Sequence, residues 1–281
     1  LKKLNQIFKI MAAKNTTTKL TTFSVCSEEY ENDDLISARE VSKKLGTNHI
    51  EVRPNKKEAM EAYSDYLLTI EDINHRFVFY YFLAKALQEE GYKVAICGEG
   101  ADEMYAGYPV YRDLQTYVNK IERTTQEYAG LMSQNMSKII KHLATKLHKG
   151  KFKELYWFMI KYQLPYFQLN PVDKCSMRFG VELRVPYLDL KHSLAIINLN
   201  KKWILKGKIE KSILREAFKE AGLPSIQRKK VFAGTRTLPD FYTTLTDLAV
   251  SKYDLLSKKY PKIAPALDPI ELYSLDVLDS G

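Results

Sequence analysis

The sequence predicts an α/β protein in which a parallel sheet is followed by a mostly helical region. Its first part alternates strand-like and helix-like segments, which is typical of a parallel sheet with right-handed crossovers. From residue 114 to residue 168, apolar residues recur at helical spacing and no segment has a convincing strand pattern. We therefore divide the chain into an α/β part, residues 1–114, and a mostly helical part, residues 115–281.

Two strands and a helix are expected first. The segment KLTTFSV, at 19–25, has the pattern of a strand that leads into a polar loop. Asp33 or Asp34 can cap the next helix, whose apolar residues lie largely on one side until Gly46 ends it. HIEV, at 49–52, carries the β-branched residues that are typical of a second short strand.

A compact apolar strand completes the α/β part. Before it, helical stretches are expected at 60–70 and 77–90, and the second stops at Gly91. KVAIC, at 93–97, predicts a strand that is buried on both faces of a parallel sheet. Because open parallel sheets bind ligands at the carboxyl ends of their strands, the segment after residue 97 is the first candidate for a binding site.

The two ends of the chain have patterns of their own. Apolar residues within 1–11 recur at helical spacing with no capping residue ahead of them, so we expect the chain to start after its true beginning. Another amphipathic helix is expected over 209–221. The end of the chain carries several prolines and is expected to form a loosely ordered tail.

Composition excludes several classes of protein. The 281 residues carry 43 Lys and Arg against 34 Asp and Glu, a net charge of +9, and 45% are hydrophobic, which excludes a collagen-like or wholly disordered chain. No apolar run approaches the ~18 to 20 residues of a membrane span, and no secretory signal is present. We therefore expect a cytoplasmic protein without a membrane partner. Three cysteines without a CxxC pair, and histidines without metal-ligand spacing, disfavour disulfide and His-built metal sites.

The segment GEGADEMYAGY, which begins at Gly98, carries the strongest chemical signal. Its first two glycines let the backbone approach a ligand closely and aim N–H groups at an anion. The carboxylates of Glu99, Asp102 and Glu103 would repel one another unless a cation or raised pKa values relieved them. Mg²⁺ on a nucleotide would do so, because it prefers one or two carboxylates plus phosphate oxygens. The alternative is an acidic turn that caps the next helix.

Two further segments could contribute charged groups. In DKCSMRFGVELRVPYLD, at 173–189, Arg184 and Asp189 could form an Arg–carboxylate arrangement in a cleft or a structural salt bridge. In 207–222, basic residues recur at spacings of three and four on one helix face. These residues are Lys208, Lys211, Arg215 and Lys219. Phosphate or carboxylate ligands could lie against this row, or it could be a solvated basic face.

Taken together, these segments resemble the synthetase domain of the asparagine synthetase family. TFSV, LGTNHIEV, CGEGADEMYAGY, DKCSMRFGVELRVPYLD and KIEKSILREAF occur in the family's order within residues 20–235. The resemblance implies a twisted parallel sheet of the ATP-pyrophosphatase type (adenine nucleotide alpha hydrolase-like). It also implies that residues 1–114 are a nucleotide-binding part and that residues 115–281 complete the synthetase active site.

The same resemblance implies an ATP-dependent carbon–nitrogen ligase that uses Mg²⁺. Family members activate a carboxylate as an acyl-adenylate, release pyrophosphate, and let an amine attack. The expected substrates are a small-molecule carboxylate, aspartate in the asparagine synthetases, and ammonia or another amine. A glutaminase domain or subunit is a possible partner, whereas nucleic acid is not expected, because the basic residues are spread along the chain without a recognised motif.

Site residues are carried over from the family by motif. Asp102 resembles the Mg²⁺ ligand. Glu99 resembles the acidic residue that could orient or deprotonate the incoming amine. Lys211 resembles the lysine that stabilises charge as the adenylate forms and collapses. Arg184 is expected to have a substrate-binding or structural role.

The adenine and ribose pocket of the family falls at Val25, Cys97 and Gly98. Cys97 replaces the usual Ser, and this loses a strong hydroxyl hydrogen bond. The family's phosphate-binding loop, SGGxDS, and the first strand that it ends are expected just upstream of residue 1 and are missing here, so we expect this chain as written to hold ATP poorly. The family's glutaminase half is also missing from this sequence.

Three alternatives remain open. A related adenylating enzyme, β-lactam synthetase-like or peptide-cyclising, would change the acceptor; Glu99 favours the asparagine-like branch, because β-lactam synthetases typically have Tyr there. A catalytically inactive paralogue could retain the fold as a binding module. Nucleic-acid binding would show as a steep dependence of affinity on salt.

Overall fold

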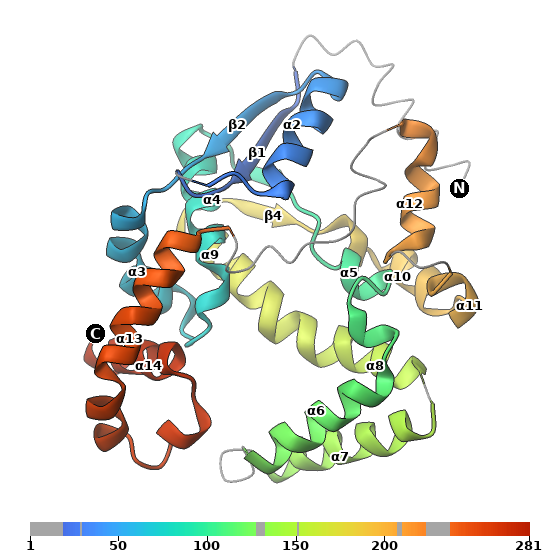
Figure 1. The fold of residues 1–281 in the computed structure, drawn as a ribbon. Coiled ribbons are helices and arrows are strands. Elements are labelled where there is room, and N and C mark those ends of the chain that lie inside the picture. The colour runs from blue at the N-terminus through green and yellow to red at the C-terminus, as the bar shows by residue number, and fades with distance from the viewer. Residues whose placement is uncertain (1–18, 29, 128–132, 151, 207–209, 223–236) are drawn as a thin grey trace.

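The protein is a mostly helical α/β molecule with two small parallel sheets (Figure 1). The structure, a computed structural model, describes residues 19–28, 30–127, 133–150, 152–206, 210–222 and 237–281. Strand β1 (Thr21–Val25) pairs with β2 (Asn48–Val52), and β3 (Val94–Ile96) pairs with β4 (Glu182–Arg184). Within the described ranges, the strands form two separate pairs and not the single sheet that the alternation predicts.

Strand β4 lies in the part that the sequence predicts to be mostly helical. It has only three residues, so it offers no alternation by which a sequence pattern could reveal it. Its place is fixed by tertiary pairing, in which Ala95 is the register partner of Leu183 and the N–H of Cys97 donates to the carbonyl oxygen of Arg184 at 2.9 Å.

The expectation that the third strand is buried on both faces is wrong. Val94 is 43% exposed and Ile96 is 75% exposed. Successive side chains of a strand point to opposite faces, so these two residues share one face and Ala95 occupies the other. Within the described residues, β3 has a strand partner on one side, and the face shared by Val94 and Ile96 remains open.

Helix α2 (Asp33–Leu45) begins earlier than the sequence predicts, by one residue if Asp33 is the expected cap and by two if it is Asp34. Its N-cap is Asn32, whose side chain accepts a hydrogen bond from the N–H of Leu35 at 2.8 Å, so the expectation of an aspartate cap is wrong. Asp33 and Asp34 occupy the first turn instead, where a carboxylate is stabilised by the positive end of the helix dipole. The helix ends at Gly46, as expected.

The remaining helices agree with the expectation of a mostly helical second part. Helices α3 (Lys56–Ile70) and α4 (Val78–Glu89) connect β2 to β3. The other α-helices are α5 (Ala101–Met104), α6 (Leu114–Glu127), α7 (Gln134–His148), α8 (Phe152–Phe158), α9 (Asn170–Arg178), α10 (Leu190–Ile197), α11 (Lys201–Ile204), α12 (Ser212–Phe218), α13 (Pro239–Lys259) and α14 (Pro269–Ser280). The 3₁₀ turns are η1 (His75–Phe77), η2 (Pro109–Tyr111), η4 (Pro186–Leu188), η5 (Lys219–Ala221) and η8 (Ala264–Ala266), and η3 (Met159–Leu169) is a π-helix.

The end of the chain is ordered, contrary to the expectation of a loose tail. Helix α14 begins with a reciprocal capping box between Asp268 and Glu271. Leu272 is fully buried, and Ser274 exchanges a hydrogen bond of 2.6 Å with the hydroxyl of Tyr63. Pro269 does not interrupt the helix, because it occupies the first turn, where its missing N–H has no intrahelical partner to lose.

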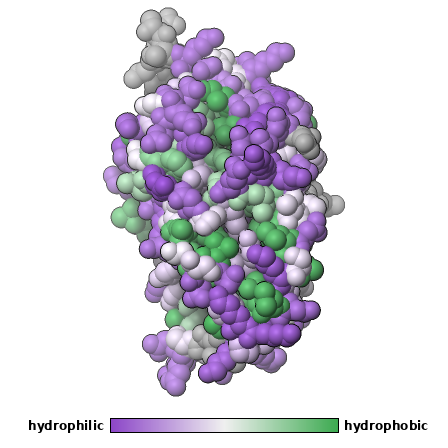
Figure 2. Space-filling view, turned by 90° about the vertical axis from the view of Figure 1, so that its left-hand side faces the viewer, coloured by the Kyte–Doolittle hydropathy of each residue, from purple (hydrophilic) through white to green (hydrophobic). Residues whose placement is uncertain are grey.

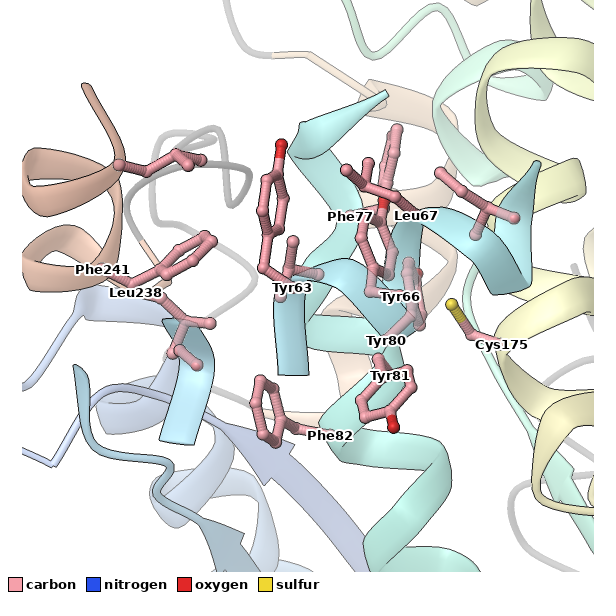
Figure 3. Close-up of a cluster of buried hydrophobic side chains, with 14 of the residues drawn as sticks. Tyr63, Tyr66, Leu67, Phe77, Tyr80, Tyr81, Phe82, Cys175, Leu238 and Phe241 are labelled. Atoms are coloured by element: carbon pink, nitrogen blue, oxygen red, sulfur yellow. The ribbon is translucent and has the colours of Figure 1, made fainter. Parts of the chain in front are cut away.

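The largest buried cluster joins segments from both parts of the chain. It contains residues of α3, α4, α9 and α13, and Figure 3 shows its aromatic side chains, with Tyr63 between α4 and Phe241. A second cluster holds Tyr111, Leu155 and Met159, together with residues of α6 and α7.

The surface of the molecule is mixed in character. The face drawn in Figure 2 carries hydrophilic residues interspersed with small hydrophobic groups. Among the helices that the structure describes, none combines the length and the apolar character needed to cross a membrane.

Candidate functional site

The segment after β3 turns sharply into the short helix α5. Gly100 precedes this helix with a φ of 87°, in the left-handed region that favours glycine. A Cβ at this position would lie 2.3 Å from Cδ2 of Leu188, in η4. The turn therefore needs glycine both for its backbone conformation and for the close approach of Leu188, and it determines where the carboxylates of Asp102 and Glu103 lie.

Asp102 forms an ion pair with Lys211. Nζ of Lys211 lies 3.1 Å from Oδ1 of Asp102, and the two side chains are 22% and 24% exposed. The lysine is the N-cap of α12 and has a φ of 55°, an uncommon left-handed conformation for a residue that is not glycine. The ion pair brings a residue of α5 together with a residue that lies more than a hundred positions later.

Gly107 makes room for the Asp102 carboxylate. A Cβ built on Gly107 would lie 1.7 Å from Oδ1 of Asp102 and 2.9 Å from its Cα. The N–H of Gly107 also donates a hydrogen bond of 2.7 Å to the carbonyl oxygen of Asp102. A side chain at position 107 would therefore displace the carboxylate that faces Lys211.

Glu99 accepts a hydrogen bond from a buried tyrosine. The hydroxyl of Tyr80, on α4, donates to Oε1 of Glu99 in a short contact. Tyr80 is 8% exposed, and burial followed by the nearby Glu99 charge raises its pKa well above the ordinary value. Tyr80 is therefore protonated at neutral pH and acts as the donor.

Glu103 is buried beside two polar side chains. Its Oε1 accepts hydrogen bonds from the hydroxyl of Tyr108 at 2.7 Å and from Nε2 of Gln168 at 3.0 Å. Burial raises the pKa of Glu103 to about 7, the Tyr108 hydrogen bond opposes that shift, and the charges of Asp102 and Glu99 add to it. The raised pKa is one of the two remedies that the sequence predicts for three neighbouring carboxylates.

The residues expected at the nucleotide lie in different sheets. Val25 is the last residue of β1 and packs against the large hydrophobic cluster. Cys97 and Gly98 continue β3, where Gly98 is exposed and burial raises the pKa of the Cys97 thiol.

Arg184 and Asp189 have different partners. The exposed side chain of Arg184 donates from Nε to Oε1 of Glu182 at 2.9 Å. Asp189 caps α10, where its Oδ1 accepts a hydrogen bond of 3.1 Å from the N–H of His192. The structure thus does not join these two side chains in the arrangement that their spacing permits.

The basic row is described only in part. Lys211 faces Asp102, Nε of Arg215 donates to the carbonyl oxygen of Glu210 at 2.6 Å, and Lys219 is exposed. The amphipathic segment expected over 209–221 forms α12 and η5 from residue 212 onward. Lys208 lies outside the described residues.

Sequence reasoning did not single out three polar residues at this site. Tyr80 lies in the run FVFYYF, at 77–82, whose pattern indicates only a buried helix. Tyr108 belongs to the segment with the strongest chemical signal but carried no assigned role. Gln168 offers no signal in the sequence, because only the tertiary structure brings it to Glu103.

Comparison with known proteins gives a consistent set of similarities. A family model described as asparagine synthase matches residues 7–267. Asparagine synthetase B (glutamine-hydrolyzing) of Escherichia coli (strain K12) is 29% identical over 198 residues, which are 68% of this chain and 30% of that protein. The glutamine-hydrolyzing asparagine synthetases of Cricetulus griseus and Homo sapiens are 29% and 28% identical over 210 residues, 73% of this chain and 31% of each relative. The chain thus spans about a third of the length of these relatives.

Proposed function

The chain belongs to the asparagine synthase family, and from this premise we propose that it takes part in ATP-dependent amide formation, with aspartate as the carboxylate and asparagine as the product. The observation that carries the proposal is the 3.1 Å ion pair between Asp102 and Lys211. It places a carboxylate suited to a metal–polyphosphate and a cation suited to a leaving pyrophosphate at one position, which is the arrangement that phosphoryl and adenylyl transfer need.

The reaction has two steps. An oxygen of the substrate carboxylate attacks the α-phosphorus of ATP, the bond to the β-phosphate oxygen breaks, and pyrophosphate leaves. The amine then attacks the acyl carbon, the bond to AMP breaks, and the amine gives up a proton.

Lys211 serves the first step, because its ammonium group offsets the negative charge that builds up on the leaving pyrophosphate. The ammonium group is half-buried, and its attraction for the pyrophosphate is stronger there because water is partly excluded.

Asp102 is suited to hold Mg²⁺ with the polyphosphate. It offers a hard oxygen ligand, and Gly107 leaves its Oδ1 unobstructed by a Cβ. When bound, Mg²⁺ would supply positive charge against the phosphate oxygens. Asp102 keeps a cationic neighbour in Lys211.

Glu99 serves the second step as the carboxylate that orients the amine or takes its proton. Tyr80 holds one oxygen of this carboxylate in the structure. We place the nucleotide against Val25, Cys97 and Gly98 and keep Arg184 as a substrate-binding or structural residue. Ammonia is the expected amine, with a glutaminase domain or subunit as its source when glutamine is the donor, because the relatives are named glutamine-hydrolyzing.

Pyrophosphate release tests the proposal. We expect the full chain to release pyrophosphate only when ATP, Mg²⁺ and aspartate are all present, and to form asparagine when ammonia is added. Asp102→Asn is expected to weaken the use of Mg-ATP, and Lys211→Ala to depress turnover at saturating ATP. Both changes should leave thermal stability close to that of the wild type, because the two side chains are partly exposed.

Two exposed residues provide matched controls. Asp254→Asn and Lys258→Ala, both on α13, make the same chemical changes on the surface and should leave pyrophosphate release unchanged. An equal loss of thermal stability in Asp102→Asn and Lys211→Ala would indicate a structural ion pair instead. Nucleotide binding without pyrophosphate release for any carboxylate would favour a binding module.

A further inference from the structure

Tyr80 is placed by the core and not by the loop that it contacts. Its ring lies 4.5 Å from that of Phe79 and 6.2 Å from that of Phe77, centroid to centroid. Figure 3 shows it on α4 among the buried aromatic side chains of α3 and α4. A ring held on several sides cannot change rotamer without disturbing close-packed neighbours. The hydroxyl of Tyr80 therefore has a fixed position from which to meet Glu99.

The contact holds a carboxylate that lies in the turn between β3 and α5. Glu99 lies three residues after the end of β3 and stands between Gly98 and Gly100, which carry no side chains that could restrain its own. The tyrosine hydroxyl donates to Oε1, and a hydrogen bond to a charged acceptor is among the stronger ones in proteins. Holding one oxygen restricts the rotation of the carboxylate and hence the directions in which the other oxygen can point.

We propose that Tyr80 is a positioning residue for Glu99, and that it acts in amide formation but not in carboxylate activation. The proposal rests on the function proposed above, in which Glu99 orients the amine or takes its proton. It follows from geometry: the core determines where the Tyr80 hydroxyl lies, and the hydroxyl determines how Glu99 faces the reacting carbon. Loss of the hydroxyl should therefore affect the amine step selectively.

Tyr80→Phe tests this selectivity, because it removes the hydroxyl and keeps the ring. The full chain is assayed at saturating ATP, Mg²⁺ and aspartate while ammonia is varied. We expect the rate of aspartate-dependent pyrophosphate release in the first turnover, in which the adenylate forms, to stay within about twofold of the wild type. The rate at which asparagine then forms at subsaturating ammonia should fall about tenfold, which corresponds to about 1.4 kcal/mol.

Tyr81→Phe is the matched control. Tyr81 is the next residue on α4, is buried to a similar degree, and donates its hydroxyl to Oδ2 of Asp65 at 2.5 Å. Neighbouring residues of a helix point about 100° apart, so removal of this hydroxyl should leave both steps unchanged. A wild-type rate of asparagine formation in Tyr80→Phe at subsaturating ammonia would overturn the proposal. So would an equal loss of both steps together with a loss of thermal stability, which indicates a structural role.

A spectroscopic measurement tests the contact without any turnover. In protein labelled with [¹³Cζ]tyrosine, Glu99→Gln should shift the Tyr80 resonance, assigned by its loss in Tyr80→Phe, and leave the Tyr81 resonance in place. An unchanged Tyr80 resonance would overturn the proposal. Failure of the wild type to release pyrophosphate would contradict the proposed function instead, and the resonance shift would still decide whether Tyr80 holds Glu99.

Discussion

Three carboxylates at the end of β3 are each stabilised in a different way. Asp102 faces the ammonium group of Lys211, Glu99 accepts the hydroxyl of Tyr80, and Glu103 is buried beside donors with its pKa raised to about 7. The three carboxylates thus have different environments although they lie close together in the sequence. This separation allows neighbouring residues of one chemical type to be proposed for different roles.

The buried carboxyl of Glu103 should make stability depend on pH. Its pKa lies at about 7 in the folded chain, against an ordinary value of 4.5, so the folded state binds more protons than the unfolded state between these two values. The contribution of Glu103 to the free energy of unfolding therefore falls by roughly 3 kcal/mol as pH rises from about 4.5 to 7, since one pKa unit corresponds to about 1.4 kcal/mol. Glu103→Gln cannot ionise and should lose this dependence.

Chemical denaturation at pH values from 4.5 to 7.5 gives the free energy of unfolding of Glu103→Gln and of the wild type. The effect is the difference between these two free energies. The matched control is Glu61→Gln, on α3, whose side chain is 65% exposed. Glu61→Gln should keep the wild-type dependence of the unfolding free energy on pH. A difference between Glu103→Gln and the wild type that stays constant over the whole pH range would contradict a raised pKa at this position.

At the scale of elements, the site depends on a turn and a helix of four residues. Helix α5 is too short to be stable by itself, so its position depends on packing against η3, η4 and α10. Gly107 follows this helix and contacts the Asp102 side chain closely enough to exclude any Cβ. The sequence shows the glycine, but only the structure shows the atom for which it makes room.

Gly107→Ala should destabilise the folded chain by about 1–3 kcal/mol, because the added methyl group overlaps both the Asp102 carboxylate and its Cα. Thermal or denaturant unfolding measures this change. Gly98→Ala is the matched control for stability, since a Cβ there meets no atom within 4 Å and the backbone is not left-handed. Equal stabilities of the two variants would show that the turn adapts to a side chain at position 107.

At the scale of the whole molecule, the large cluster unites distant parts of the sequence. It packs α3 and α4 against α9 and α13, so residues before 90 share one core with residues after 237. The division at residue 114 remains a prediction about function, in which the first part binds the nucleotide and the second completes the site.

Two leucines of α13 test the importance of this core. Leu245 is fully buried in the cluster, whereas Leu255 is 69% exposed on the same helix. Leu245→Ala should cost about 2–5 kcal/mol of unfolding free energy through lost burial and a residual cavity. Leu255→Ala should stay within about 0.5 kcal/mol of the wild type. Similar losses in both variants would contradict the placement of this helix.

Local sequence patterns predicted the elements that are determined by residues close together in the chain. The helices between residues 114 and 168 and the end of α2 at Gly46 are confirmed. The wrong expectations concern pairing, burial and the ends of elements: the two separate strand pairs, the exposed face of β3, the Asn32 cap, and the ordered α14. Burial depends on what packs against an element, and a pattern within the element does not contain that information.

The sequence by itself determined the family resemblance, the α/β character and the residue types available for the chemistry, because these depend on ordered motifs and local periodicity. Only the tertiary structure decided that Lys211 meets Asp102, that Tyr80 holds Glu99 and that Gln168 reaches Glu103. The physical reason is distance along the chain. Contacts between residues many positions apart are set by the packing of whole elements, and single-residue patterns cannot specify them.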